Sequence, residues 1–245
     1  MINNPAPIPD SRPPAAGRLR ALLEGLPAEL APPAPDSPPG RILAATRDLF
    51  ADAGFAGVPV RAIAQHAGVN VAMINYYFGT KDRLVDAVLT RELQLLLHDV
   101  ITGLDGGASA EDVLAEFPLR ILASLRRDPR RLRLIRLAVS TEPDRLRRLI
   151  RSLGEHSVLG VSRVLAELVT EAQTGARLPA LPARSVLLYL MANAYGLVFM
   201  EPIAREVVGF DLDDDGHWQE HRDSLAHLLR HGLLSGSERG EGSHA

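Results

Sequence analysis

The side chains best suited to specific chemistry lie between residues 59 and 81. Asn75 carries an amide, which can form two hydrogen bonds with adenine in the major groove of DNA. The methyl groups of Val71 and Ala72 are suited to contact with the methyl group of thymine. Hydroxyl groups and cations that can bind phosphate lie around them, on Arg61, Tyr76, Tyr77 and Lys81.

Two short helices must hold these side chains in place. The apolar spacing predicts one helix from Pro59 to about His66 and another from Asn70 to Phe78, with a tight turn between them. Gly68 suits a turn that needs a positive φ angle, and Asn70 can cap the second helix. This arrangement predicts a helix-turn-helix, whose second helix enters the major groove. The expected core positions are Ile63, Val69, Ile74 and Phe78, and the expected outer positions are Val71, Ala72, Asn75 and Tyr76.

The wider segment from residue 41 to residue 88 carries a pattern with several parts. A first helix with Leu49-Phe50 and Gly54-Phe55 at its end is followed by Ile63-Ala64, Ala67-Gly68-Val69, Tyr77-Phe78 and Lys81. This string resembles the DNA-binding head of the TetR/AcrR family of bacterial regulators. The resemblance implies base-reading positions at Val71, Ala72 and Asn75. It also implies contacts with the DNA backbone at Met73, Tyr76, Tyr77 and Lys81.

Three residues depart from the family pattern. Pro59 stands where the family usually has Ser or Thr, so it offers no side chain that caps the helix or binds a phosphate. Met73 replaces a small or hydroxyl-bearing residue, and Asn75 replaces the most common residue at its position, a Tyr. The base preference of better-known members therefore does not transfer to this chain.

The rest of the chain is dominated by helical patterns, so the expected fold is all-α. Apolar spacing and capping residues predict helices over 80–99, 110–127, 129–140, 143–174, 182–208 and 216–234. The expected organisation is a DNA-binding head over residues 40–83 and a helical domain over residues 84–234. Eleven of the 18 prolines lie in residues 1–39, which predicts a disordered arm with only a transient helix around residues 18–25. Residues 235–245 are rich in Gly and Ser and predict a disordered tail.

The helical domain is expected to bind a small-molecule effector and to form a homodimer, as the family resemblance implies. Val186 to Met200 is apolar on nearly all sides, as expected of a helix that packs on its own core and on a partner. Its 15 residues fall short of the roughly 18 to 20 that cross a bilayer, so no membrane is expected as a partner. The interface candidates are Ala192, Ala194, Gly196, Leu225 and Leu228. The candidates for the effector pocket are Phe117, His156, Tyr189, Met191, Asn193 and Phe199.

Arginine is concentrated in residues 118–151, which hold eleven Arg against three acidic residues. The plainest interpretation is two solvated helix faces. A second interpretation is an anionic effector, such as a phosphate-bearing acyl thioester. A third is contact with residues 201–224, which hold eight acidic and two basic residues.

Composition narrows the classes of function. The 245 residues include no Cys, which excludes disulfides and thiolate chemistry and is typical of a reducing cytoplasm. The net charge of −3 argues against a general binder of polyanions, so a DNA site must be local. The sequence has no set of residues arranged for catalysis and no Gly-rich phosphate loop. We therefore expect that the protein is not an enzyme and binds no cofactor. The expected function is a ligand-responsive repressor that binds a palindromic double-stranded DNA operator, and a helical interaction or scaffold protein is the alternative.

Two patterns of metal-ligating residues are weak. His217 and His221 fit the pattern H-x-x-E-H, but a zinc site needs a third protein ligand, and few residues remain downstream to supply one. Residues 211–216 resemble the first half of a calcium loop, but its twelfth position is Arg222, where the metal needs a carboxylate. A cap for the last helix explains the Asp run better. No metal is expected, and a His-rich metalloprotein is the least favoured alternative.

Overall fold

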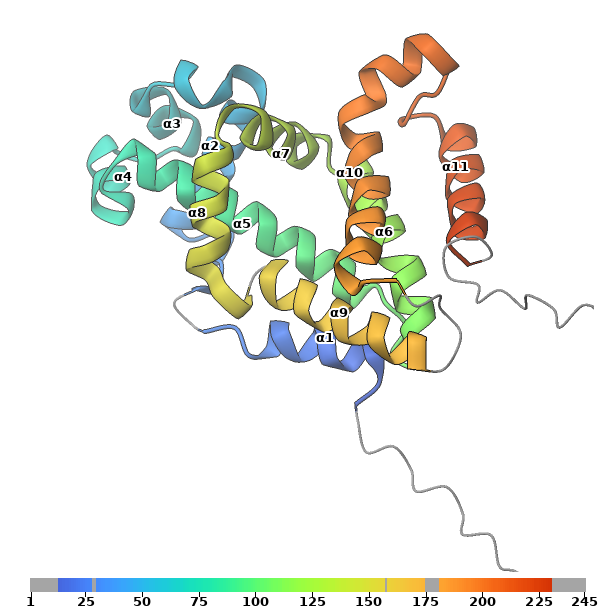
Figure 1. Ribbon diagram of the computed structural model, residues 1–245. Coiled ribbons are helices and arrows are strands. Elements are labelled where there is room, and N and C mark those ends of the chain that lie inside the picture. Colours follow the sequence, from blue (N-terminus) through green and yellow to red (C-terminus); the bar gives the residue numbers. More distant parts are fainter. Residues whose placement is uncertain (1–12, 28–29, 157, 175–180, 231–245) are drawn as a thin grey trace, which may run out of the picture.

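Figure 1 shows a computed structural model of the chain, which describes residues 13–27, 30–156, 158–174 and 181–230. These residues form helices and connecting turns with no β-strand among them, which confirms the all-α prediction. In chain order the helices are α1 (Ala15–Glu24), α2 (Pro38–Gly57), α3 (Val60–Ala67), α4 (Val71–Phe78), α5 (Lys81–Thr102), α6 (Ala110–Arg127), α7 (Pro129–Thr141), α8 (Pro143–Leu153), the 3-10 turn η2 (Gly154–His156), α9 (Val158–Thr174), α10 (Ala183–Val208) and α11 (Asp215–Leu228).

The head consists of α2, α3 and α4, which lie together at one end of the molecule (Figure 1). Phe50 and Phe55 of α2 form an edge-to-face pair whose ring centroids lie 5.4 Å apart. Ile63 of α3 and Ile74 of α4 belong to the same buried cluster, as does Leu84 in the first turn of α5. The head is therefore packed directly onto α5, because this helix supplies part of the head core.

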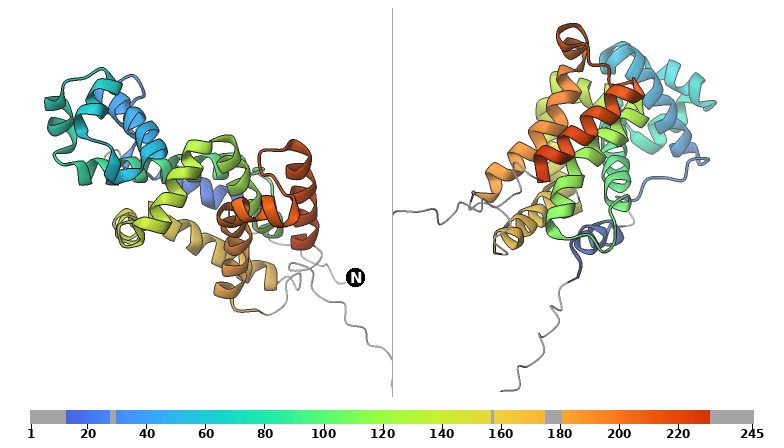
Figure 2. Two further views of the ribbon diagram at one scale, coloured as in Figure 1. Left: turned by 90° about the horizontal axis from the view of Figure 1, so that it is seen from above. Right: turned by 90° about the vertical axis from the view of Figure 1, so that its right-hand side faces the viewer.

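The body is a second buried cluster, built mainly from α5, α6, α9 and α10. Seen from above, the head lies at one end of the molecule and α10 and α11 lie at the other (Figure 2). Four apolar residues near the start of α5 are buried in the head: Leu84, Val85, Val88 and Leu89. Four more, further along the same helix, belong to the core of the body: Leu96, Leu97, Val100 and Ile101. The helix α5 is therefore a continuous connection between the two parts.

The N-terminal arm is helical over a segment where the sequence predicts disorder. The helix α1 packs against α5 and α9, with Ala16 and Leu19 fully buried. Arg18 forms an ion pair with Glu171 of α9 at 2.5 Å. The prediction of a disordered arm is therefore wrong for residues 15–24, because a short helix that is marginal alone becomes stable when its apolar face is buried. Residues 1–12 and the predicted disordered tail at 235–245 lie outside the described residues.

The helix predicted over residues 143–174 is two helices. α8 ends at Leu153 and α9 begins at Val158. Gly154 between them has φ +52° and ψ −129°, a conformation that glycine adopts far more readily than other residues. The single-helix prediction is wrong because the amphipathic pattern continues on both sides of this break and does not reveal it.

Gly54 is expected to be essential to the shape of α2. It has φ +75° and ψ +169° inside the helix, where it produces a kink before Phe55. Replacing Gly54 with Ala should lower the free energy of unfolding by about 1–3 kcal/mol, because a residue with a Cβ atom is strained in this conformation. Gly57→Ala in the last turn is the control, since Gly57 lacks a positive φ and a methyl group there meets only ordinary contacts. Urea unfolding of both variants measures the difference, and equal stabilities would contradict the prediction.

Candidate nucleic-acid interface

The turn between α3 and α4 has the geometry that the sequence predicts. Gly68 has φ +62° and ψ +40°, and its N–H donates to the carbonyl of Gln65 at 3.2 Å. The side-chain oxygen of Asn70 accepts a hydrogen bond from the N–H of Ala72 at 2.9 Å and so caps α4. These contacts determine where α4 starts and how it is oriented relative to α3. The helix-turn-helix prediction is therefore confirmed.

The helix α4 presents one face to solvent at the end of the head. Ala72 and Asn75 are exposed, and Tyr76 keeps 82% of its surface accessible. The predicted outer position Val71 is half-buried, and Met73 is packed against the head core in the same way. Partial burial limits how far these two side chains reach from the helix. Ala72, Asn75 and Tyr76 are therefore the residues of α4 best placed to meet a groove.

Of the four predicted phosphate-binding residues with polar ends, Tyr76 lies on this face, and the other three lie on α3, near the end of α4 and at the start of α5. Arg61 is exposed on α3, and Tyr77 is exposed with its ring centroid 5.0 Å from that of Tyr76. The ammonium group of Lys81 donates to the carbonyl of Ala56 at 3.1 Å, which ties the start of α5 to the end of α2. A phosphate that binds Lys81 must therefore share or replace this contact.

Three exposed polar residues on this part of the head were missed by the sequence analysis. Gln65 and His66 are exposed in the last turn of α3, and Arg83 is exposed in the first turn of α5. All three lie within a few residues of the turns that flank α4. Their polar type and their positions at helix ends were the available signal.

The six effector-pocket candidates do not come together at one place. Phe117 and Met191 line a small cavity in the body that also meets Tyr195, and burial raises the pKa of the Tyr195 phenol. His156 lines a different cavity, next to α1. The three remaining candidates lie on the exposed side of α10 and line neither cavity, because their helix turns that side away from the body: Tyr189, Asn193 and Phe199.

The helix α10 is buried along one stripe and exposed along the rest. The stripe has one residue per turn, at Val186, Leu190, Ala194 and Val198. The exposed side is also apolar, with Leu188, Tyr189, Met191, Phe199, Met200, Ile203, Val207 and Val208. The stretch Ala183–Glu201 has 19 residues and is long and apolar enough to cross a membrane by length and composition alone. This window is longer than the 15-residue apolar run from Val186 to Met200, and 22% of it is buried in the chain, as a stripe packed on α6 and α9.

The predicted interface residues differ in whether a partner can reach them. Ala192 and Leu228 are exposed, and Gly196 is half-buried. Ala194 and Leu225 are buried in the chain's own core, with 0% and 4% of their surface accessible. The prediction that these two residues meet a partner is therefore wrong, because the body already covers them.

A buried ionic network joins the head to the body. Arg131 of α7 is 6% exposed, and its guanidinium donates to Asp99 at 2.7 Å and to Glu92 at 3.2 Å. Arg47 of the head pairs with Glu92 at 3.5 Å and also with Asp128. Burial alone would raise the pKa of Asp99, but hydrogen bonds from Arg131 and from the Ser124 hydroxyl outweigh it and hold that pKa below its usual value. Helices α2, α5, α6 and α7 thus share one junction, in which two guanidinium groups meet three carboxylates.

The arginines of residues 118–151 are largely engaged within the chain. Arg136 pairs with Glu201 of α10 at 3.3 Å, and Arg126 pairs with Asp215 of α11 at 2.5 Å. These contacts correspond to the third interpretation of the arginine cluster, in which it meets the acidic residues 201–224. A further set joins α8 to α5, where Arg145 binds Asp82 and Asp86, each at 2.8 Å.

The acidic loop before α11 has a structural role. The carboxylate of Asp214 accepts a hydrogen bond from the N–H of His217 at 2.9 Å and so caps α11. The helix begins at Asp215, one residue before the predicted start. The His217 imidazole accepts a hydrogen bond from the N–H of Asp211 at 3.1 Å, and its ring stacks on Phe210. The ring of His221 meets that of Phe210 edge to face, with the ring centroids 5.4 Å apart, and burial lowers the pKa of the His221 imidazole. Within the described part of the chain, no three His, Asp or Glu side chains are arranged to hold a metal ion.

Comparisons with known proteins agree with this geometry. The model of the family described as "Bacterial regulatory proteins, tetR family" matches residues 42–88. Over 60 residues, 23% of this chain, the sequence is 47% identical to the "HTH-type transcriptional repressor Rv3405c" of Mycobacterium tuberculosis and to an HTH-type transcriptional regulator of Mycobacterium bovis. The match spans about a third, 32%, of the length of each of these relatives.

Solved structures show the same fold over most of the chain. A transcriptional regulator of Streptomyces coelicolor is 22% identical, with 81% of this chain and 99% of that chain covered and a TM-score of 0.62. The regulator FadR of Bacillus subtilis, solved in complex with stearoyl-CoA, is 20% identical, with 79% and 98% covered and a TM-score of 0.57. The exposed α4 on a three-helix head defines a helix-turn-helix protein with a helical second domain. Its head matches the tetR family model over residues 42–88, and its fold is shared with a solved structure described as a tetR family transcription regulator.

Proposed function

We propose that the protein is a cytoplasmic transcriptional repressor that binds a palindromic DNA operator as a homodimer and responds to a small-molecule ligand. The observation that carries this proposal is the capped, exposed α4, which offers Asn75 and Ala72 on an intact head. A side chain that reaches base edges from the start of a helix is the usual means by which a helix-turn-helix reads sequence. The related repressor of Mycobacterium tuberculosis supports a repressing role.

The uncovered side of α10 supports the proposed homodimer. Its apolar residues continue over five turns, and Leu188 and Ile203 keep 65% and 53% of their surface accessible. A contiguous apolar surface of this kind marks an interaction site in a folded protein. A second copy of the chain is the occupant that also explains the head, because two half-sites one helical turn apart supply the affinity that one small head lacks.

Selection of bound sequences from a random duplex library tests this function directly. The purified protein, at physiological salt, should enrich a pseudo-palindrome with half-sites separated by about one helical turn. Dimers without any enriched sequence would contradict the proposal and favour a helical interaction protein. Repeating the selection after unfolding and refolding removes co-purified ligand that could hold the head in a non-binding state.

Two substitutions in the head should have different effects on DNA binding. Asn75→Ala should cost about 1–3 kcal/mol on the selected operator and relax the preference at one base step, because the amide contacts a base edge. Lys81→Ala should weaken binding to all DNA sequences alike, because a phosphate contact carries no sequence information. It should also reduce the slope of log affinity against log salt concentration by about one. Titrations on the operator and on scrambled duplexes at several salt concentrations measure both. Gln219→Ala, an exposed amide on α11, is the control. Equal losses on every sequence for Asn75→Ala would refute base reading by this residue.

A further inference from the structure

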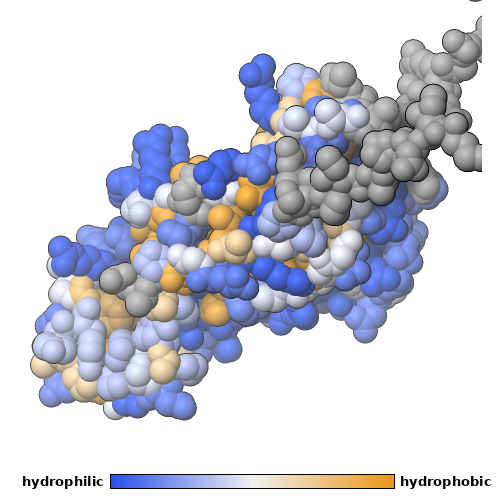
Figure 3. All heavy atoms as spheres, turned by 90° about the horizontal axis from the view of Figure 1, so that it is seen from below, coloured by the Kyte–Doolittle hydropathy of each residue, from blue (hydrophilic) through white to orange (hydrophobic). Residues whose placement is uncertain are grey.

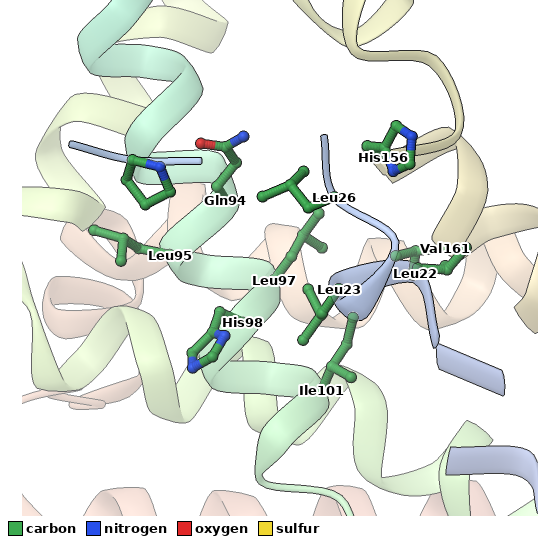
Figure 4. Close-up of a pocket in the computed structure, with 11 residues that line it drawn as sticks. Leu22, Leu23, Leu26, Gln94, Leu95, Leu97, His98, Ile101, His156 and Val161 are labelled. Atoms are coloured by element: carbon green, nitrogen blue, oxygen red, sulfur yellow. The ribbon is translucent and has the colours of Figure 1, made fainter. Parts of the chain in front are cut away.

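A cavity lies between the arm helix α1 and the helix α5 that carries the head. Its volume is about 220 Å³, and Figure 4 shows the residues around it. Leu22, Leu23 and Leu26 form one wall from the arm, and residues 94–101 of α5 form the opposite wall. Figure 3 shows the side of the molecule that carries α1 and α9, where apolar residues are exposed in the middle of the face. With Pro32, the arm thus contributes four of the apolar side chains that a ligand here would contact.

The arm wall is part of the folded protein. Ala16 and Leu19 of α1 are fully buried in the body. Two long-range polar contacts also hold the helix, the ion pair from Arg18 to Glu171 and a hydrogen bond from Arg20 to the carbonyl of Leu104 at 2.5 Å. The cavity is therefore pre-formed, which is usual for ligand sites in proteins.

The lining of the cavity selects the chemistry of its occupant. It is mainly leucine, isoleucine and valine, and the described residues that line it include no Arg, Lys, Asp or Glu. The polar groups in the lining are the side chains of Gln94, His156 and His98, of which His98 is exposed. The Gln94 amide donates to the carbonyl of Leu30 at 2.8 Å. The Nδ1 atom of His156 is buried and has no hydrogen-bond partner. An unpaired buried polar atom costs free energy, so a ligand that bonds to it gains from that contact.

We propose that this cavity binds a neutral, mostly apolar small molecule with a single hydroxyl or carbonyl group directed to His156. An apolar cavity of about 150 Å³ holds benzene, so this one suits a compact molecule somewhat larger than a single ring. A carboxylate or phosphate is disfavoured, because a buried anion needs a charged partner that the lining does not supply. The inference rests on the ligand-responsive part of the proposed function and assigns the arm to it.

The helix α5 connects this site with the head. The side chains of Leu97, His98 and Ile101 line the cavity, while Leu84 and Val88 of the same helix lie in the head core. From residue 84 to residue 98 the helix rises about 21 Å. A molecule between α1 and α5 therefore contacts the element on which the head is packed.

Three bicyclic probes of matched shape test the site in the full-length protein. We expect 2-naphthol to bind about threefold to tenfold more tightly than naphthalene, because it adds one hydrogen bond. The anion 2-naphthoate should bind at least about tenfold more weakly than 2-naphthol, because its charge has no partner. Probe fluorescence or calorimetry gives the dissociation constants.

Variants of the wall locate the binding. Leu23→Trp fills the cavity and should weaken 2-naphthol by about tenfold or more. Ala21→Trp places the same side chain on the exposed side of α1 and should leave binding unchanged. His156→Phe should retain naphthalene and lose the preference for 2-naphthol, a result that a misfolded variant would not produce.

The outcomes separate this inference from the proposed function. No binding of any probe, tightest binding of 2-naphthoate, or 2-naphthol binding unaffected by Leu23→Trp and His156→Phe would each overturn the site. The operator selection on the same wild-type preparation, without probe, reports on DNA binding alone. Probe binding without an enriched operator would support the cavity as a ligand site and contradict the proposed repressor function. An enriched operator without probe binding would contradict only the ligand site.

Discussion

Arg131→Met is expected to lower the free energy of unfolding by about 3–5 kcal/mol, because it removes the guanidinium that donates to the buried Glu92 and leaves this carboxylate only the longer ion pair with Arg47 at 3.5 Å. Glu92 is 2% exposed and receives the guanidinium of Arg131 at 3.2 Å. Methionine has a similar length, so the loss comes chiefly from charge rather than from a cavity. The neighbouring substitution Arg130→Met is the control. Arg130 is largely exposed and pairs with Asp48 at 3.4 Å, so its loss should cost less than about 1 kcal/mol.

Urea unfolding of the two variants at neutral pH measures this difference. A third variant, Arg131→Met with Glu92→Met, should recover much of the loss, since it removes the uncompensated charge together with its former partner. A loss in Arg131→Met no larger than that in Arg130→Met would show that the network contributes little.

The dependence of stability on pH gives a second measure of the same network. The pKa of Asp99 lies below its usual value in the folded protein, so its contribution is present above the usual carboxyl pKa of about 4. That contribution is lost as the pH falls through the lowered folded pKa. The acid part of the stability profile should therefore be less steep in Arg131→Met, because this variant lacks the hydrogen-bond donor that lowers the pKa.

The head was predictable because its residues act locally and in a fixed order. The positive φ of Gly68, the cap by Asn70 and the burial of Ile63 and Ile74 all follow from residue type and spacing within one short segment. Each of these features needs only its neighbours in the chain. The half-burial of Met73 did not follow, because it depends on how the whole head packs.

The arm and the cavity were not predictable for the opposite reason. Leu19 and its neighbours show an apolar face, but the proline-rich surroundings favour disorder until another part of the chain covers that face. The covering helices α5 and α9 are distant in sequence, as Glu171 beside Arg18 illustrates. The arginine cluster shows the same limit, because charge counts do not reveal that Arg131 is buried among carboxylates.

The sequence placed the expected interface on the last two helices without separating the buried residues of α10 from its exposed ones. The long apolar pattern indicates two packed sides, but it does not tell which side meets the chain's own core. The structure makes the distinction, since Ala194 faces the body while Leu188 and Ile203 remain exposed. These two exposed residues are therefore the appropriate positions for a test of the dimer.

The double substitution Leu188→Glu and Ile203→Glu is expected to convert the proposed homodimer to a monomer. In a two-fold dimer each change occurs twice, so four carboxylates would be buried without partners, at several kcal/mol in total. Operator affinity should then fall by about a hundredfold or more, because the two heads no longer bind as one unit. Neither residue belongs to the buried stripe of α10, so the fold of the chain should be retained.

Sedimentation and operator titration measure the two expected losses separately. Val139→Glu adds the same charge at an exposed apolar position on α7 and should leave both the dimer and the operator affinity unchanged. A double variant that remains a dimer would show that the exposed side of α10 is not the interface. A monomer with undiminished operator affinity would retain the interface and exclude the two-fold recognition of DNA. The expected pair of losses would instead link the apolar side of α10 to the spacing at which the two α4 helices meet successive major grooves.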